Sequence, residues 1–349
     1  MNDRPAQLGL MERLDQGPVV CGEGYLFEFE RRGYLQAGAF VPEIVLEHPE
    51  LVSSLHREFV HAGSEVVPAL TYYGHREKLQ MVGKEDLLEP LNREALALAV
   101  QVATDAGVLS AGDLCNTNVF GPDRASELAA RAMFEEQMSW VADAGVDFVV
   151  AETFSYGAEA LIALECIHEA GLPAVVTLAV HQAEETRDGW TPEDACRRLA
   201  DAGAEVVGLN CIRGPRTMLP LIERIRAAVD VHVAALPVPY RTTPAQPSFQ
   251  SLRDPDCDCL PDGRPFPTAL DPFTCNRYEI AQFAQAAHRM GVNYLGVCCG
   301  AGAHHVRAVA EALGKNPPAS RYSPEMSKHA FLGSDERLNV HNRQYAPKL

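Results

Sequence analysis

The chain alternates eight times between a short apolar segment and a longer segment with helical periodicity, and this alternation constrains its fold more than any other feature. The apolar segments are rich in β-branched residues, which indicates strands. A glycine after alanine repeatedly ends a helical segment, as a left-handed helix cap requires. Eight strand–helix units in about 300 residues predict an α/β protein with a (β/α)8 TIM barrel. The predicted strands are residues 19–21, 65–70, 108–113, 146–152, 174–179, 205–211, 231–236 and 292–297.

A doubly wound sheet is the alternative architecture for such an alternation. It usually carries a glycine-rich phosphate loop after its first strand. Here the segment 22–24 is too short for that loop, and no GxxxxGK[ST] motif occurs. We therefore expect a barrel domain over 1–315, with one helix over 43–59 and a long loop over 237–275. The C-terminal tail extension, 316–349, is expected to pack on the barrel or on a partner subunit.

The charge and hydropathy of the chain exclude several classes of partner. The formal net charge is −17 and the pI is about 5.1. Nucleic-acid binding and electrostatic attachment to an anionic membrane both need a basic face, so neither is expected. No run approaches 18 apolar residues, which argues against a membrane span. The N-terminal segment lacks the apolar centre of a signal peptide, so we expect a cytoplasmic location.

Three cysteines fall at the ends of predicted strands. Cys211 ends the sixth strand, and the adjacent Cys298 and Cys299 follow the eighth, between glycines that permit a turn. Strand ends of a barrel converge on one face, where catalytic groups lie. Three sulfur ligands with one open position are typical of catalytic zinc. Three buried thiols, or a disulfide between Cys298 and Cys299, remain alternatives.

The other cysteines invite simpler interpretations. Cys166 and Cys196 fall in helical segments and are expected as small apolar side chains of the core. Cys257 and Cys259 lie in a polar loop and are expected as surface thiols, with a metal-binding pair as the alternative. Ten cysteines in 349 residues are too few for a disulfide scaffold.

Two groups of motifs resemble a known family. The segments 208–211 (GLNC) and 296–300 (GVCCG) are similar to the zinc site of the homocysteine S-methyltransferase family. The segments 27–34, 37–40, 47–50 and 55–59 resemble the N-terminal part of its betaine-dependent branch. The resemblance covers residues 17 to 315 and part of the tail.

The resemblance implies a function and a cofactor. Zn2+ held by Cys211, Cys298 and Cys299 would take the thiol of homocysteine as its fourth ligand and lower the pKa of that thiol. The thiolate would then attack a methyl group of a betaine-like quaternary ammonium donor and give methionine. A sulfonium donor, S-methylmethionine or dimethylsulfoniopropionate, is the alternative. No organic cofactor is implied, and the partners are these small molecules and other copies of the chain in a homo-oligomer.

The resemblance also implies which residues bind the substrates. The homocysteine site would consist of Glu23, Gly24, Glu152 and Asn210, although the family usually has Asp at the first of these positions. An onium group is commonly bound by aromatic faces. Here the donor residues would be Phe40, Tyr72, Tyr73 and His341. Thr153 replaces an aromatic residue of the betaine-dependent enzymes, and Phe40 stands where Trp is common.

Two readings from other classes stay open at this point. A non-enzymatic zinc or onium-binding protein would close its metal site with a fourth protein ligand. A thiol redox protein would use Cys298 and Cys299 as a reducible pair.

Overall fold

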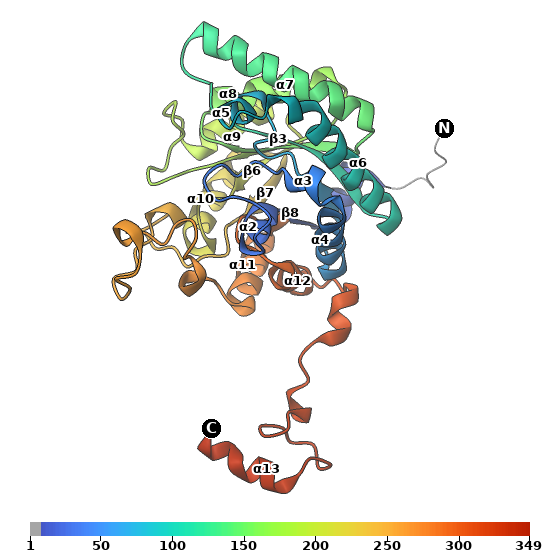
Figure 1. The fold of residues 1–349 in the computed structure, drawn as a ribbon, viewed down its shortest axis with the longest axis vertical. Coiled ribbons are helices and arrows are strands. Elements are labelled where there is room, and N and C mark those ends of the chain that lie inside the picture. The colour runs from blue at the N-terminus through green and yellow to red at the C-terminus, as the bar shows by residue number, and fades with distance from the viewer. Residues whose placement is uncertain (1–7) are drawn as a thin grey trace.

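The eight predicted strands close into one parallel barrel. The computed structural model describes residues 8–349, and in it each strand pairs with the next in sequence while β8 pairs with β1 (Figure 1). Rings of Phe148 and Tyr294, on the non-adjacent strands β4 and β8, lie 6.4 Å apart, so side chains fill the interior. The strands are β1 Val19–Gly22, β2 Val66–Pro68, β3 Leu109–Cys115, β4 Phe148–Phe154, β5 Ala174–Leu178, β6 Val206–Asn210, β7 His232–Leu236 and β8 Tyr294–Val297.

Helices surround the barrel and alternate with its strands (Figure 1). The predicted (β/α)8 fold is therefore confirmed. The helices are α1 Leu10–Gln16, α2 Tyr25–Arg31, α3 Ile44–Glu47, α4 Pro49–Ala62, α5 Arg76–Met81, α6 Leu88–Ala106, α7 Arg124–Ala144, α8 Gly157–Glu169, α9 Pro192–Asp201, α10 Pro215–Ala228, α11 Arg277–Arg289, α12 Ala303–Ala312 and α13 Val340–Tyr345. Short 3-10 helices are η1 Glu85–Leu87, η2 Phe249–Ser251, η3 Pro261–Gly263, η4 Asp271–Phe273, η5 Pro318–Tyr322, η6 Met326–Lys328 and η7 Ala346–Lys348.

The single helix predicted over 43–59 is wrong, because the chain breaks it at His48. That residue has φ −143° and ψ 61° and separates α3 from α4. Pro49 is the first residue of α4 and has no N–H to continue the earlier helix, and proline disfavours helical geometry in the residue before it. Pro49 starts a new helix well, since its fixed φ suits that position.

The tail leaves the barrel. Its first part, η5, contacts α4 and α12. The rest runs away from the barrel as an extended segment ending in α13, drawn in red in Figure 1. Large apolar side chains along it, including Met326, Leu332 and Val340, are exposed. No described helix is long and apolar enough to cross a membrane.

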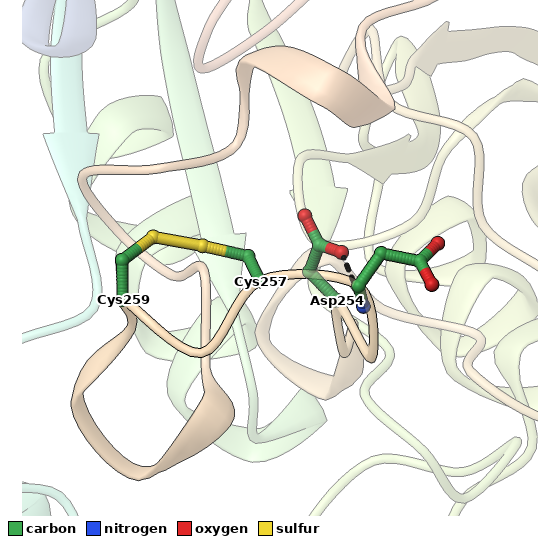
Figure 2. Close-up of a disulfide and its surroundings, with 4 residues drawn as sticks. Asp254, Cys257 and Cys259 are labelled. Carbon is green, nitrogen blue, oxygen red and sulfur yellow. Dashed lines mark hydrogen bonds between the residues drawn. A yellow bond between two sulfur atoms is a disulfide. The ribbon is translucent and has the colours of Figure 1, made fainter.

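The long loop after β7 contains a disulfide. Cys257 and Cys259 are bonded to each other, with Cα atoms 5.4 Å apart (Figure 2). The expectation of two free surface thiols is therefore wrong, and in this structure neither sulfur is free for a metal. Just before the disulfide, the backbone N–H of Asp256 donates to the Asp254 carboxylate at 3.1 Å.

Candidate active site

The three strand-end cysteines form one cluster. Sγ atoms of Cys211, Cys298 and Cys299 all lie within 4.8 Å of one another. The backbone N–H groups of Cys211 and Cys298 donate to Leu236 and Pro237 at the end of β7, at 2.8 and 3.0 Å. The strand between β6 and β8 therefore aligns sulfurs that are 87 residues apart in sequence. All three are free thiols, so the alternative of a Cys298–Cys299 disulfide is not realised.

The turn around the paired cysteines depends on Gly300. Its φ is +90°, and a Cβ there would lie 2.1 Å from Oη of Tyr240. Arg31 donates to the Gly300 carbonyl at 3.0 Å and to Oη of Tyr240 at 2.9 Å, which braces the turn. Gly24 packs as closely, since a Cβ there would lie 2.1 Å from the Ala301 carbonyl oxygen. Only glycine fits either position without backbone movement.

The cluster has the chemistry of a zinc site. Zn–S bonds of about 2.3 Å in a tetrahedron put sulfurs slightly under 4 Å apart, which fits the observed cluster. Hydrogen bonds from Cys298 and Cys299 lower the pKa of the Cys211 thiol, and the same bonds raise the pKa of Cys298 and Cys299, so Cys211 is the thiol of the cluster that ionises most readily. Among residues 8–349, no fourth His, Cys, Asp or Glu atom joins this group within the same separation. The residues present therefore fit a three-thiolate metal centre with one open position.

Buried acids lie next to the thiols. Carboxylate oxygens of Glu23 and Glu152 lie within 4.8 Å of Sγ of Cys298 and of each other. Burial, followed by the charges of Glu152 and Asp113, raises the pKa of Glu23; burial raises the pKa of Glu152 to about 7. Oε2 of Glu23 and Oδ1 of Asp113 are buried without a hydrogen-bond partner. Acids in this state would be stabilised by a cationic ligand.

Asn210 connects the acids to the thiols. Its amide nitrogen donates to Glu152 and to Oγ1 of Thr153, and lies 3.8 Å from Sγ of Cys298. Its carbonyl oxygen accepts from the Thr153 backbone at 2.9 Å and from Thr177 at 2.9 Å. These bonds fix the orientation of the amide, so the Asn210 nitrogen must face the carboxylate and the sulfur.

A cavity of about 590 Å³ opens above the thiols and includes Cys211 in its wall. Six of its sixteen lining residues are Phe or Tyr. The rings of Phe27 and Phe40 stack at 5.6 Å, and those of Tyr72 and Tyr73 lie 4.5 Å apart. Lys78 covers one face of Tyr73 at 4.5 Å from the ring centroid. The wall is lined by Leu26, Phe27, Phe40, Tyr72, Tyr73, Asn116, Asn118, Thr153, Ser155, His181, Arg187, Cys211, Ile212, Phe249, Gln250 and Phe266.

Backbone strain is concentrated at this cavity. Seven non-glycine residues within 8–349 have positive φ, and six of them line it. Such conformations cost free energy and persist where the surrounding structure enforces them, commonly at functional sites. The six are Phe40, Tyr73, Asn118, Thr153, Cys211 and Ile212.

The structure brings together most of the predicted site residues, but not all. Phe40, Tyr72, Tyr73 and Cys211 line the cavity, and the predicted homocysteine residues lie beside the thiols beneath it. His341 is in α13 on the tail, which Figure 1 shows away from the barrel, and it is absent from the cavity wall.

Sequence reasoning missed other residues of the wall, which come from α2 and from the loops after β3, β4, β5, β6 and β7. The signal that could have found them is that every loop following a barrel strand opens on the same face. The long 237–275 loop supplies part of the aromatic wall. The missed residues are Leu26, Phe27, Asn116, Asn118, Ser155, His181, Arg187, Ile212, Phe249, Gln250 and Phe266.

Comparison with known proteins finds similar sequences over nearly the whole chain. The profile of homocysteine S-methyltransferases matches residues 24–313. Betaine–homocysteine S-methyltransferase 1 of Xenopus tropicalis is 35% identical over 355 residues, covering 97% of this chain and 83% of the relative. S-methylmethionine–homocysteine S-methyltransferase BHMT2 of Mus musculus is 34% identical over 351 residues, covering 97% and 90%.

A solved structure shares the fold. The metallated form of the homocysteine methyltransferase MmuM from Escherichia coli superposes with a TM-score of 0.68 at 18% identity. The match covers 86% of this chain and 98% of that one.

Proposed function

Because the chain belongs to the homocysteine S-methyltransferase family, we propose that it methylates homocysteine at a Cys211–Cys298–Cys299 zinc centre with a betaine-like quaternary ammonium donor. Transfer of a methyl group to homocysteine is the activity of the family. The thiol cluster beneath an aromatic cavity is the observation that carries the proposal for the metal and the donor.

The acceptor end of the site would consist of the acids and Asn210. Homocysteine has a cationic ammonium group, and Glu23 and Glu152 are buried acids without a cationic partner among the described residues, so a bound ammonium group would favour their ionised forms. Asn210 holds Glu152 in place, and Gly24 packs directly against Ala301, which keeps the end of β1 close to the turn of the paired cysteines. A bound zinc ion would supply a site at which the substrate thiol is held and ionised at neutral pH.

The donor end would be the aromatic cavity. Ring faces attract an onium group that has no N–H to donate. Phe40, Tyr72 and Tyr73 line the wall, so a bound onium methyl can face the thiolate from the side of Cys211. In a single displacement, the sulfur–carbon bond forms as the carbon–nitrogen bond breaks. The electron pair of that bond stays on nitrogen, which leaves as a neutral tertiary amine, and the thiol proton goes to solvent.

The choice of donor depends on how strongly this cavity binds an ammonium head. Thr153 donates its hydroxyl to Glu152 at 2.8 Å and contributes no ring. One face of Tyr73 is already covered by Lys78. These features favour, as a second candidate, a sulfonium donor, whose better leaving group needs less assistance from binding. One relative is named for betaine and another for S-methylmethionine.

A donor panel tests the proposal. Methionine formation from homocysteine would be measured with glycine betaine, proline betaine, S-methylmethionine and dimethylsulfoniopropionate. Highest kcat/KM with an ammonium donor supports the first candidate, and turnover with sulfonium donors alone supports the second. No methionine from any onium donor by zinc-loaded protein would overturn the proposal.

We also propose a homo-oligomer in which the tail, 316–349, packs on a second copy. The exposed apolar side chains of the tail support this proposal, because the tail runs away from the barrel and the barrel does not cover them. His341 would then approach a donor site through this packing. A cytoplasmic location is proposed because the site needs three reduced thiols, which a reducing compartment maintains. Light scattering of the full chain against a 1–322 truncation tests the tail's role.

A further inference from the structure

One side chain of the cavity wall has a charge that the proposed reaction has not used. Among the described residues that line the cavity, Arg187 is the only lysine or arginine. It lies in the loop between β5 and α9. The buried acids Glu23 and Glu152 lie beside the thiols and are not among the lining residues. The described cavity wall therefore has one cationic side chain, that of Arg187.

Backbone and ring contacts hold Arg187 at the wall. Its N–H donates to the Ser155 carbonyl at 2.7 Å. Its guanidinium lies over the Tyr156 ring, 4.7 Å from the centroid, and Tyr156 packs edge-on against Phe120 at 5.1 Å. Thr186 N–H donates to the Trp190 carbonyl at 2.8 Å and closes the loop. These contacts hold the backbone of Arg187 in a structured loop, and the ring of Tyr156 is the contact that positions its guanidinium.

The nearest acids are already engaged. Asp188 accepts from the backbone N–H groups of Gly157 and Ala158, at 3.0 and 2.9 Å. Glu159 accepts from the backbone and hydroxyl of Thr117, at 2.8 and 2.6 Å. Within 8–349, no carboxylate lies within ion-pair distance of Arg187. Its guanidinium donors therefore remain available to a ligand.

Neutral polar groups surround this end of the cavity. His181 contacts Ser155 at 3.3 Å and Gln250 at 3.2 Å, and all three line the wall. Burial and the nearby charge of Arg187 lower the pKa of His181, so its imidazole is neutral at pH 7. His181, Ser155 and Gln250 can therefore form hydrogen bonds with an anionic group, but they add no second positive charge to the wall.

From this geometry we infer that Arg187 binds the carboxylate of the methyl donor and thereby orients the onium end toward the thiols. The inference rests on the proposed function. A betaine-like donor is a zwitterion, so its carboxylate is attracted to the one cation of the cavity wall and its onium end to the aromatic rings and the acids beside the thiols. A guanidinium matches a carboxylate in charge and geometry. Arg187 would therefore select onium donors that have a carboxylate over those that lack one.

Two sulfonium donors matched in reactivity test the inference: dimethylsulfoniopropionate, which has a carboxylate, and trimethylsulfonium, which has none. For Arg187→Gln we expect kcat/KM with the first to fall about 10- to 100-fold, as loss of a charged hydrogen bond predicts. Activity with trimethylsulfonium should change less than about 3-fold. Arg187→Lys should recover part of the loss. Arg198, which stacks on Trp190 at 4.4 Å outside the cavity, gives the control Arg198→Gln.

A binding measurement separates this role from turnover. Glycine betaine should raise the melting temperature of wild-type protein more than tetramethylammonium does, and Arg187→Gln should remove that difference. Equal loss of activity with both sulfonium donors, or an unchanged preference, would overturn the inference. Wild-type protein inactive with every onium donor would instead overturn the proposed function.

Discussion

The side-chain nitrogen of Asn210 lies 3.8 Å from the sulfur of Cys298, although 88 residues separate them in the sequence. The same nitrogen donates to the Glu152 carboxylate. One amide, fixed by Thr153 and Thr177, thus contacts both the thiol cluster and the acids. The metal and the homocysteine ammonium would therefore be placed relative to each other through Asn210.

Replacing Asn210 should weaken homocysteine binding selectively. In Asn210→Ala the buried Glu152 carboxylate loses a donor, which costs about 1–3 kcal/mol and predicts a 10- to 100-fold higher KM for homocysteine. Bound zinc should stay within about 2-fold of wild type, because all three sulfurs remain. Steady-state kinetics and metal analysis would check this. Asn293→Ala, at the opposite end of the barrel, is the control; an unchanged homocysteine KM in Asn210→Ala would contradict the expectation.

Zinc should depend on each cluster thiol. We expect about one zinc per chain in wild-type protein, and near-complete loss of metal and of methionine formation in Cys211→Ser. Cys196→Ser should keep both, since Cys196 is buried on α9 away from the cluster. Emission spectroscopy of dialysed protein measures the metal. Full activity in metal-free protein would exclude a zinc mechanism.

Gly300 should tolerate no side chain. Gly300→Ala combines an unfavourable φ of +90° with a Cβ only 2.1 Å from Oη of Tyr240. Gly314→Ala meets the same backbone cost at φ +77° but has no atom within 4 Å of the new Cβ. We expect the control to lose about 1 kcal/mol of unfolding free energy and Gly300→Ala to lose about 2–4 kcal/mol. Denaturation curves measure the loss of unfolding free energy, and zinc content measures the effect on the cysteine cluster. Equal losses of unfolding free energy in the two variants would mean that Tyr240 moves aside at little cost.

The fold was predictable because its signals are local and repeated. Each apolar segment is followed by a helix with a definite end, and parallel strands place their carboxyl ends on one face. The convergence of Cys211 and Cys298 can therefore be predicted from their positions at strand ends, without information on their contacts. The break at His48 also has a local signal, Pro49, but the apolar periodicity continues on both sides of it and led to the prediction of one helix.

The donor end of the site could not be predicted in the same way. Phe266 and Arg187 come from loops, whose course depends on turns and long-range packing rather than on periodicity. The disulfide of Cys257 with Cys259 also lies in a loop, where periodicity gives no signal. His341 illustrates another limit. Its motif lies in the tail, and the sequence does not indicate where the tail lies relative to the barrel.

Acid should destabilise the fold through buried histidines. Nε2 of His305 contacts the Cys275 carbonyl at 3.0 Å, and Nδ1 accepts from Gly302 N–H at 3.2 Å. Burial lowers its pKa to about 4, from an unfolded value near 6.5. The unfolded chain thus binds more protons between these values, so the contribution of His305 is complete above pH 6.5 and is lost as pH falls toward 4.

His305→Gln removes that dependence. Relative to wild type, the variant's loss of unfolding free energy between pH 7 and pH 5 should be smaller by about 1–2 kcal/mol. Urea denaturation of metal-free protein at both values measures it. The comparison with wild type cancels the opposite contribution of the buried acids. A difference of zero would mean that the folded protein protonates His305 as readily as the unfolded chain does.

Asp113 should add to the field that holds the homocysteine ammonium. Its carboxylate is buried in β3 with Oδ1 unpartnered, and burial followed by the charge of Glu152 raises its pKa. An acid with a raised folded pKa loses its stabilising contribution as pH rises, so Asp113→Asn should make metal-free protein more stable at pH 8 than wild type. A bound ammonium group favours the ionised form of a neighbouring acid, so the same change should raise the KM for homocysteine about 5- to 10-fold by removing that negative charge.

A second methyl acceptor distinguishes whether Asp113→Asn acts through the lost charge or through changed packing. 4-Mercaptobutanoate keeps the thiol and carboxylate of homocysteine but has no ammonium group. If Asp113 acts through charge, Asp113→Asn should leave the KM of this acceptor within about 2-fold of wild type, because no positive charge is present to lose an attraction. Equal losses with both acceptors would show that Asp113 only shapes the floor of the site. The two acceptors therefore separate an electrostatic role from a structural one in a single pair of proteins.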